Sequence, residues 1–272
     1  MIIKQSWEEI EISSWKNFDQ VINGMKHREW LFRGQSNAKW VLQTSLDRMF
    51  EDIQPIIRNV KGKDPIFAKE AHEKLLIKKF KSNANLYLPL IPANEKDIEL
   101  LAIMQHYGAP TRLLDVTLSP HIATYFALES GFDDCSIYAF HQTAIKSANL
   151  ENLKTATYEK LQDKIFDDKN DDEFLIVYEP EHGNQRLVIQ QGLFLVASQI
   201  VPFEDILRAY SESDSQPICK KLVISANLRY EGLERLRRMN ITSATLFPGI
   251  DGFCRSLKFQ IIEPAKNQKL LD

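Results

Sequence analysis

The stretch that most constrains the fold is residues 105–127, QHYGAPTRLLDVTLSPHIATYFA. It places Arg112, Asp115 and Thr117 between two apolar helical segments. A turn that only joins two packing helices would not need these polar side chains. The segment before it, residues 95–107, is apolar around most of a helical circumference, which is typical of a buried helix. We therefore expect a polar site between core elements here.

Turn residues set the boundaries within this stretch. Gly108 should follow a helix C-terminus, because glycine tolerates positive φ without a Cβ clash. Pro110 prevents the helix from continuing and keeps the preceding residue extended. Ser119 is expected to cap the next helix, with Pro120 at its first position. The alanines of this second helix would let another element approach closely.

Several side chains in the stretch have two interpretations. Asp115 is expected to pair with Arg112 and pin the loop, so that both are architectural. Tyr125 either packs in the core or stacks on a ligand ring. His106, at a buried helix end, is expected to be a satisfied core histidine rather than a base. His121 is a weaker catalytic candidate.

Composition limits the classes of function. The 272 residues are 44% hydrophobic and 26% charged, with a net charge of −3, so nothing drives the whole chain toward nucleic acid or membrane. No apolar run reaches signal-peptide or membrane-span length, and we expect a cytoplasmic protein without membrane association. The three cysteines are too far apart for a disulfide scaffold or a zinc site. Cys254 is expected to be a small core residue.

The N-terminal part should form a strand, a helix capped by Ser13 or Ser14, and a second strand, over residues 5–35. That second strand is Trp30-Leu31-Phe32, and Arg33-Gly34-Gln35 is expected to break it. Arg33 would then enter a cleft, with Gly34 leaving room for a ligand against the backbone. Pairing of Arg33 with a carboxylate at a sheet edge remains the alternative.

The remaining chain mixes strands and helices irregularly, which favours an α+β fold over a doubly wound sheet. Helices are expected within 41–50, 65–85 and 226–240, and after the Pro-Gly turn of 246–261; strands are expected at 135–140, 174–180 and 218–225, and at the end of 182–198. The 65–85 helix should turn Phe67, Ala71, Leu75 and Phe80 inward and leave a solvated lysine face. Residues 149–173 form a polar excursion, and the absence of a clear linker favours one domain over 1–272.

With these residues in view, the chain resembles the FRG domain family, named for a Phe-Arg-Gly signature. The signature here is Phe32-Arg33-Gly34, within LFRGQSNAKWVLQTSLDR. Residues 105–127 form the second matching block, RLVIQQGLFL (186–195) the third and TLFPGIDGF (245–253) the fourth. The blocks extend over nearly the whole chain. FRG proteins are typical of bacteria and phages, often near defence loci.

The order of the blocks also resembles the ADP-ribosyltransferase fold, a small twisted β-sheet core with surrounding helices. In that resemblance Arg33 ends the first core strand, and Thr117 to Ser119 precede an Ala/aromatic helix. Residues 186–194 correspond to the third motif. That motif usually carries a late Glu, and Gln190 and Gln191 stand in its place here.

The resemblance implies NAD as the substrate and no metal ion. It implies that a cleft joins the blocks, with an arginine on the pyrophosphate, a hydroxyl on a ribose and a tyrosine on a flat ring. The implied catalytic residues are Arg33, Gln190 and Gln191. The implied dinucleotide-binding residues are Arg33, Gly34, Gln35, Thr117, Ser119, Tyr125 and Arg186.

Three functions remain open from the sequence. The first is transfer of ADP-ribose to a protein or nucleic-acid acceptor, as in a toxin or defence effector. The second is a nucleotide- or nucleic-acid-binding module that has lost transfer. The third is a hydrolase or nuclease using Asp115, His106 and Arg112, although no paired carboxylates with metal spacing are present. Glu179 and Glu181 are the candidates to replace the missing acid.

Overall fold

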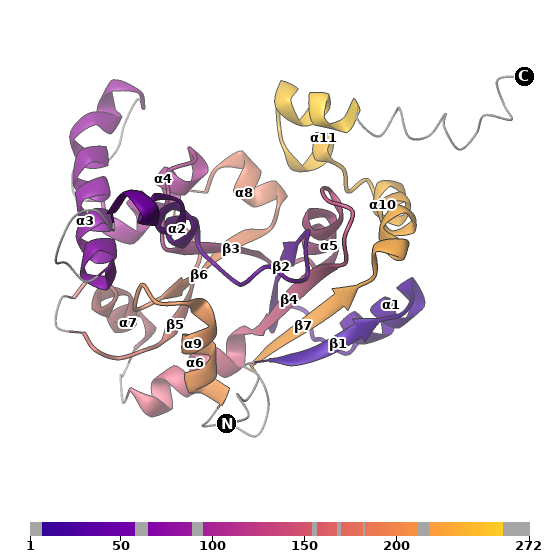
Figure 1. Ribbon diagram of the computed structural model, residues 1–272, viewed down its shortest axis with the longest axis horizontal. Coiled ribbons are helices and arrows are strands. Elements are labelled where there is room, and N and C mark those ends of the chain that lie inside the picture. Colours follow the sequence, from indigo (N-terminus) through magenta and orange to yellow (C-terminus); the bar gives the residue numbers. More distant parts are fainter. Residues whose placement is uncertain are drawn as a thin grey trace, which may run out of the picture.

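A seven-stranded sheet surrounded by helices forms the body of the protein (Figure 1). The computed structural model describes residues 7–57, 65–88, 95–153, 157–167, 170–181, 183–211 and 218–257. The strand order is β1-β7-β4-β2-β3-β6-β5, and of the described strand pairs only β1–β7 is parallel. The predicted α+β class is confirmed, with a sheet larger than the small one expected.

The strands are β1 (Glu8–Ile12), β2 (Trp30–Gln35), β3 (Leu113–Thr117), β4 (Cys135–His141), β5 (Leu175–Tyr178), β6 (Gly192–Ala197) and β7 (Cys219–Ile224). The longer helices are α1 (Trp15–Asn23), α2 (Ser45–Ile57), α3 (Pro65–Asn83), α4 (Asp97–His106), α5 (Pro120–Leu128), α6 (Gln142–Asn152), α9 (Phe203–Ser211) and α10 (Arg229–Arg238). Shorter helices are α7 (Tyr158–Lys164), α8 (Gln185–Ile189) and α11 (Ser243–Leu246), with 3₁₀ turns at Ala84–Leu86 and Ala226–Leu228. Residues 250–257 are also helical.

The sheet splits between β2 and β3. These strands share a single register pair, Phe32 with Thr117, whereas β2 pairs with β4 along its whole length from Trp30 to Gln35. Beyond the Phe32–Thr117 pair the two strands diverge, so the sheet consists of the halves β1-β7-β4-β2 and β3-β6-β5. A split of this kind leaves polar groups of the inner strands available to a ligand, since they are not used by a neighbouring strand.

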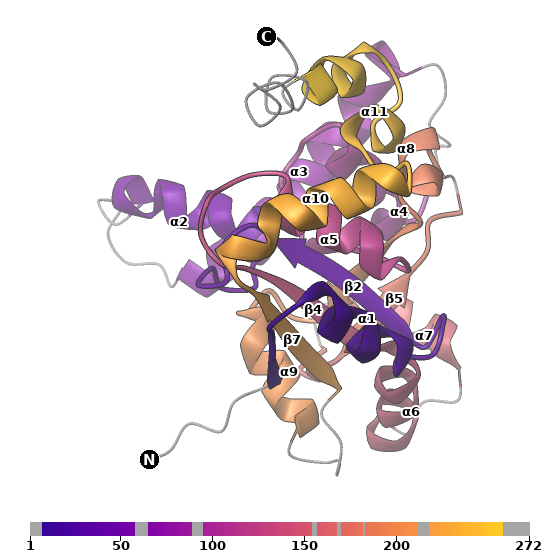
Figure 2. The ribbon, with the colours of Figure 1, turned by 90° about the vertical axis from the view of Figure 1, so that its right-hand side faces the viewer.

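Two apolar clusters fill the two sides of the sheet. Leu31 belongs to one cluster and Phe32 to the other, because successive strand residues point to opposite faces. Helices α1, α5 and α10 contribute to the cluster around Phe32, and α10 packs over α5 (Figure 2). Helices α4, α6, α7 and α9 contribute to the cluster around Leu31. The split between β2 and β3 therefore lies between the two apolar clusters that cover the two sides of the sheet.

Gly34 is needed for the close contact of α5 with β2. A Cβ at this position would lie 2.0 Å from the Ala123 carbonyl oxygen and 2.6 Å from the Ala127 backbone nitrogen. The expectation that α5 allows close approach is confirmed. The expectation that Gly34 leaves room for a ligand is wrong on this side of the strand, because the α5 backbone occupies that space.

Several local predictions agree with the structure. Ser14 caps α1, Ser119 caps α5 with Pro120 at its start, and Gly108 has a φ of 85° just after α4. The main difference in this part of the fold is that β2 continues through Arg33, Gly34 and Gln35, which were expected to break it. Pairing with β4 along its whole length keeps these residues extended.

The α3 helix begins at Pro65 as predicted, but its inward face is different. Ala71 is exposed and the Leu75 residue is 47% exposed, whereas Glu73 and Ile77 are buried. Phe80 is half-buried as part of the inward side, and the side chain of Phe67 lies outside the described residues. A buried glutamate displaces the expected apolar stripe because it has a charged partner in the core.

That partner is Arg112. Its Nε donates hydrogen bonds of 3.0 and 2.7 Å to the two carboxylate oxygens of Glu73, and its Nη1 donates one of 3.1 Å to the Ser198 carbonyl oxygen. Both partners are almost fully buried, with 5% exposure for Arg112 and 1% for Glu73. The predicted Arg112–Asp115 pair is wrong, because Arg112 turns toward α3 while Asp115 stays exposed.

The predicted polar excursion at 149–173 contains ordered structure. It holds the end of α6 and all of α7, from which Leu161 and the following Ile165 are buried in the core. Residues 154–156 and 168–169 lie outside the described residues. The helix α9 has no counterpart in the sequence-based expectations. Across the described ranges, none of the helices has the length and apolarity needed to cross a membrane.

Candidate functional site

A cavity of about 790 Å³ opens at the split between β2 and β3. Its volume falls within the range of ordinary ligand pockets, about 300–1,000 Å³. Residues from β2 and the loop after it, α2, α4, β3, α5, α8 and β6 line it. Its charged or titratable lining side chains are Arg33, Arg48, Glu51, Asp52, His106, Asp115 and Arg186. The predicted convergence of the first three sequence blocks on one cleft is thus what the structure shows.

Arg33 lies at the split and connects its two sides. Its Nη1 donates a 2.9 Å hydrogen bond to the Asp115 backbone carbonyl oxygen, and the same atom is 3.9 Å from the Asp115 Oδ2 atom. The Arg33 Nε has no hydrogen-bond partner among the described residues. Burial lowers the pKa of Arg33, Asp115 partly offsets this effect and Arg48 adds to it. An arginine keeps its charge even so, and this cation is only partly satisfied by protein groups.

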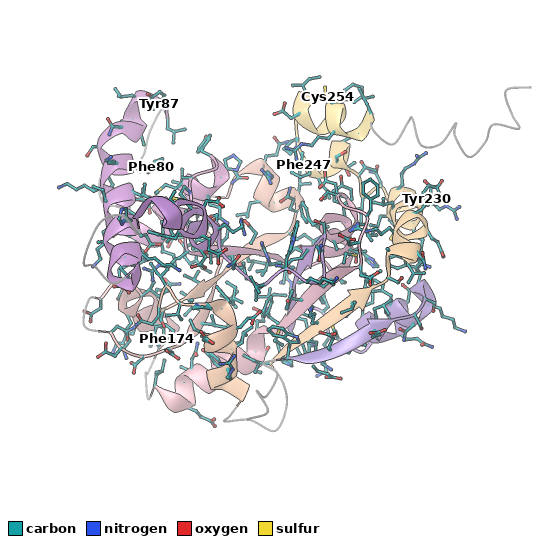
Figure 3. All side chains as sticks on the ribbon, viewed as in Figure 1. Phe80, Tyr87, Phe174, Tyr230, Phe247 and Cys254 are labelled. Carbon is teal, nitrogen blue, oxygen red and sulfur yellow. The ribbon has the colours of Figure 1, made fainter. Side chains whose placement is uncertain are left out.

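Arg186 supplies a second cation from α8. Its guanidinium lies 4.7 Å from the centre of the Phe247 ring, and Arg255 lies 4.6 Å from the same centre. Phe247 (labelled in Figure 3) also contacts Phe126 edge-to-face with ring centres 6.1 Å apart. Burial lowers the pKa of Arg186, and the Asp115 carboxylate partly offsets that effect. The fourth sequence block, which contains Phe247, therefore contacts the cavity-lining Arg186 without lining the cavity itself.

Asp115 is an exposed acid at the sheet split. Its side chain is 66% exposed and lines the cavity. It influences the pKa of both Arg33 and Arg186, so it lies within electrostatic range of both cations. Asp115 is therefore a residue of the candidate site and not the architectural partner of Arg112 that the sequence predicted.

His106 lines the cavity at the end of α4, where it is half-buried. Burial lowers its pKa below the ordinary 6.5, and the nearby Arg186 cation lowers it further, so the neutral imidazole is favoured. His121, in contrast, packs near Phe18 at a ring distance of 6.2 Å and does not line the cavity. Arg112 also lies outside the cavity. It is therefore separated from Asp115 and His106, the other two residues that the hydrolase or nuclease hypothesis needs.

Thr117 and Gln190 line the cavity, but their polar groups hold the protein together. Thr117 Oγ1 donates a 2.7 Å hydrogen bond to the Gln190 carbonyl oxygen and accepts one of 3.1 Å from the Ser119 backbone N–H. Gln190 Nε2 donates a 3.0 Å hydrogen bond to the Leu246 carbonyl oxygen. Ser119 itself caps α5 and lies outside the cavity lining. These contacts fasten β3 to the α8–β6 turn.

Two other predicted site residues do not line the cavity. Tyr125 is only 2% exposed and packs in the core cluster around Phe32, so packing, rather than stacking on a ligand, is its role. The next residue of α5, Phe126, lines the cavity instead, because one helical step turns a side chain by about 100°. Gln191 is exposed with a φ of 47°, and its carbonyl oxygen accepts a hydrogen bond from the Leu118 N–H.

Gln35 lines the cavity as expected and is 7% exposed. Its Nε2 donates a 3.3 Å hydrogen bond to the Val41 carbonyl oxygen. The neighbouring Trp40 lines the cavity with 57% exposure. Sequence reasoning missed Trp40, Arg48, Phe126 and the α2 acids Glu51 and Asp52. For Trp40 and Arg48 the available signal was their place inside LFRGQSNAKWVLQTSLDR, seven and 15 residues after Arg33.

The other singled-out polar residues lie elsewhere. Glu179 and Glu181 do not line the cavity, and Glu181 is 3.8 Å from Lys96 in an exposed contact. Cys254 is exposed rather than buried (Figure 3). The lysine face of α3 is exposed, as expected for a solvated surface: it comprises Lys74, Lys78, Lys79 and Lys81. Within the part of the chain that the structure describes, no three His, Cys, Asp or Glu side chains are arranged to hold a metal ion.

Comparison with known proteins gives one family. The family model of the FRG domain matches residues 28–135. No curated protein and no solved structure matches the chain. The matched segment includes β2 with Arg33, the rim with Trp40, and β3 with Asp115 and Thr117, which together make much of the cavity wall. The predicted resemblance to the FRG domain family is therefore confirmed over residues 28–135.

Proposed function

We propose that this protein binds NAD in the cavity at the split of the sheet, cleaves the nicotinamide–ribose bond and transfers ADP-ribose to an acceptor. The observation that supports this most is the position of Arg33. Its guanidinium is anchored on one side by the Asp115 carbonyl oxygen, while it lines a cavity large enough for a dinucleotide segment. An anchored arginine is well suited to hold a pyrophosphate in a fixed orientation.

The cavity offers more than one cation to the phosphates. Arg33, Arg48 and Arg186 all line it, and among the described residues none of them has a carboxylate oxygen closer than the 3.9 Å between Arg33 and Asp115. A guanidinium is permanently charged and donates through a planar fork that matches phosphate oxygens. Three arginines around one cavity therefore favour a ligand with several negative oxygens, such as the pyrophosphate of a dinucleotide.

The cavity also offers aromatic surface for flat rings. Trp40 lies at its solvent-accessible rim with 57% exposure, and Phe126 contributes from α5. An exposed indole beside a cationic pocket is a suitable stacking partner for an adenine or nicotinamide ring. This assignment moves the proposed stacking role from Tyr125 to Trp40.

Cleavage of the nicotinamide–ribose bond creates positive charge on the ribose. The protein must then hold the phosphates, orient the ribose and present negative or dipolar groups to the developing cation. The Arg33 and Arg186 guanidinium groups perform the first task. The acceptor of the ADP-ribose would be a protein or a nucleic acid, in keeping with a toxin or defence effector.

The direct test is incubation of the purified protein with NAD, with quantification of free nicotinamide by chromatography. Calorimetric titration with NAD and with ADP-ribose measures binding separately from cleavage. The proposal expects saturable binding of both ligands and time-dependent nicotinamide release. Failure of both NAD and ADP-ribose to bind would refute the proposal.

A second function has a specific observation in its favour. Gln190 replaces the usual late Glu, and its amide is used in a hydrogen bond to Leu246, so the third block supplies no free acid there. A binding module that retains the dinucleotide pocket and lacks transfer fits this arrangement. Binding of NAD or ADP-ribose without release of nicotinamide would identify this function.

A further inference from the structure

We infer that Asp115 is the catalytic carboxylate of the site, taking the part of the acid that the third block lacks. This inference rests on the proposed function. Three acids line the cavity: Glu51, Asp52 and Asp115. Asp115 lies within a paired strand and acts on Arg33 and Arg186, whereas Glu51 and Asp52 lie on the helix α2.

The support of Asp115 is the rigid centre of the sheet. It lies in β3 between Leu114 and Val116, which are 1% and 4% exposed, and β3 pairs with β6 along its whole length. The backbone that carries Asp115 is therefore fixed by two buried neighbours and a paired strand. Catalytic groups need such support, because a misplacement of about 1 Å already reduces the rate strongly.

The carboxylate of Asp115 is free to meet a ligand. Its side chain is 66% exposed, and its Oδ2 is 3.9 Å from the Arg33 Nη1, beyond hydrogen-bond distance. The short contact of Arg33 is to the backbone carbonyl oxygen of Asp115 instead. By comparison, Glu51 on α2 accepts a close hydrogen bond from the Gln43 side chain.

The position of Asp115 relative to the arginines fits the ribose end of the ligand. Asp115 acts electrostatically on both Arg33 and Arg186. A pyrophosphate held by these arginines is covalently linked through the ribose to the nicotinamide, so the ribose must lie close to the phosphates. The negative charge of Asp115 repels the phosphates and attracts the cationic nicotinamide-ribose end, which orients the dinucleotide.

The bond between the ribose C1′ and the nicotinamide nitrogen breaks, and both electrons leave with the nitrogen, so that nicotinamide departs neutral. The positive charge that remains on C1′ and the ring oxygen is stabilised by the Asp115 carboxylate. The oxygen of water or of an acceptor hydroxyl forms the new bond to C1′, and its proton passes to Asp115 and from there to solvent.

The test compares Asp115→Asn, Asp115→Glu and Asp115→Ala with the parent. Asp163→Asn, an exposed acid of α7 outside the cavity lining, is the matched control. Asp115→Asn is expected to reduce the turnover of nicotinamide release by about 10²–10³, the scale for losing one group that stabilises transition-state charge. ADP-ribose binding should change little, and Asp163→Asn should behave as the parent.

A second readout separates chemistry from structure. Added formate should restore part of the activity of Asp115→Ala, because a small carboxylate can enter the vacated space, and Asp115→Glu should exceed Asp115→Asn in activity. Thermal melting of every variant identifies loss of folding. If one of the variants is destabilised, formate rescue of Asp115→Ala still shows whether the carboxylate takes part in the reaction.

The outcomes that overturn the inference are distinct from those that overturn the proposed function. Parental activity in Asp115→Asn, or no effect of formate on Asp115→Ala, removes Asp115 from the chemistry while the transferase proposal stands. An equal loss of activity in Asp52→Asn would also contradict the assignment of Asp115 as the catalytic carboxylate. A parent that binds NAD without releasing nicotinamide overturns the transfer reaction together with the role of Asp115. A parent that binds neither ligand overturns the proposed site itself.

Discussion

The guanidinium of Arg33 on β2 donates a 2.9 Å hydrogen bond to the backbone carbonyl oxygen of Asp115 on β3. The bond crosses the place where the sheet splits, since the two strands share only the pair Phe32–Thr117. Arg33 thus links the two halves of the sheet while its guanidinium lines the cavity. Arg33 therefore has a structural role in the sheet and a proposed role in ligand binding, and substitutions can separate the two roles.

Arg33→Lys should fold and bind a dinucleotide more weakly. Lysine keeps the charge and can still reach one oxygen, but it lacks the planar fork. The loss in binding free energy for ADP-ribose should be about 1.5–3 kcal/mol, the scale of a hydrogen bond to a charged group. Calorimetric titration measures it, with Arg238→Lys on the exposed side of α10 as the control. Unchanged affinity would make Arg33 a purely structural residue.

Gly34→Ala should destabilise the protein because the α5 backbone leaves no space for a methyl group. The nearest atom would be 2.0 Å from the new Cβ, so α5 or β2 must shift. Overpacking of this kind costs about 1–3 kcal/mol or more. Denaturant unfolding should show the loss, whereas Gly183→Ala, whose Cβ would be 3.6 Å from its nearest neighbour, should be close to neutral. Equal stability of the two variants would contradict the packing argument.

Glu73→Gln and Arg112→Met should each destabilise strongly. Each removes one partner of a buried pair and leaves the other charge without compensation, at a cost of about 3–5 kcal/mol. Asp115→Asn, in contrast, should leave the unfolding free energy nearly unchanged, because Asp115 is exposed. The comparison by denaturant titration tests which acid Arg112 needs. A larger effect for Asp115→Asn than for Glu73→Gln would support the original pairing.

Only one of the three cysteines should react quickly with a thiol reagent in the native protein. Cys254 is exposed, whereas Cys135 and Cys219 are buried. Burial raises the pKa of Cys135 to about 11 and that of Cys219 further, which suppresses the reactive thiolate. Titration with a chromogenic disulfide should give one thiol per chain before denaturation and three afterwards. Cys254→Ser should abolish the fast phase.

His121 should make stability depend on pH. Burial lowers its pKa below 6.5, an effect that Asp19 partly offsets and Arg235 reinforces. Between the folded-state pKa and 6.5 the unfolded chain therefore binds more protons, so this contribution is complete above pH 6.5 and is lost as pH falls. Denaturant unfolding at pH 7.5 and 5.5 should show a smaller difference for His121→Gln than for the parent. The exposed His27 provides the control substitution.

The sequence by itself determined most of the local structure. Ser14 and Ser119 cap helices, Pro120 begins one and Gly108 follows one, because caps and turns depend on the chemistry of a few adjacent residues. Motif spacing also identified Arg33 and residues 105–127 as parts of one site. These features need only information within a short window of the chain.

Tertiary structure alone decided which side chains meet. Arg112 found Glu73, 39 residues away in the sequence, rather than Asp115, three residues away. The backbone of α5 filled the space beside Gly34, and a single helical step placed Phe126 in the cavity and Tyr125 in the core. Such choices depend on how distant elements pack, since a buried charge takes whichever partner the closed chain brings within reach. Because Arg112 pairs with Glu73, the carboxylate of Asp115 is not used in that ion pair.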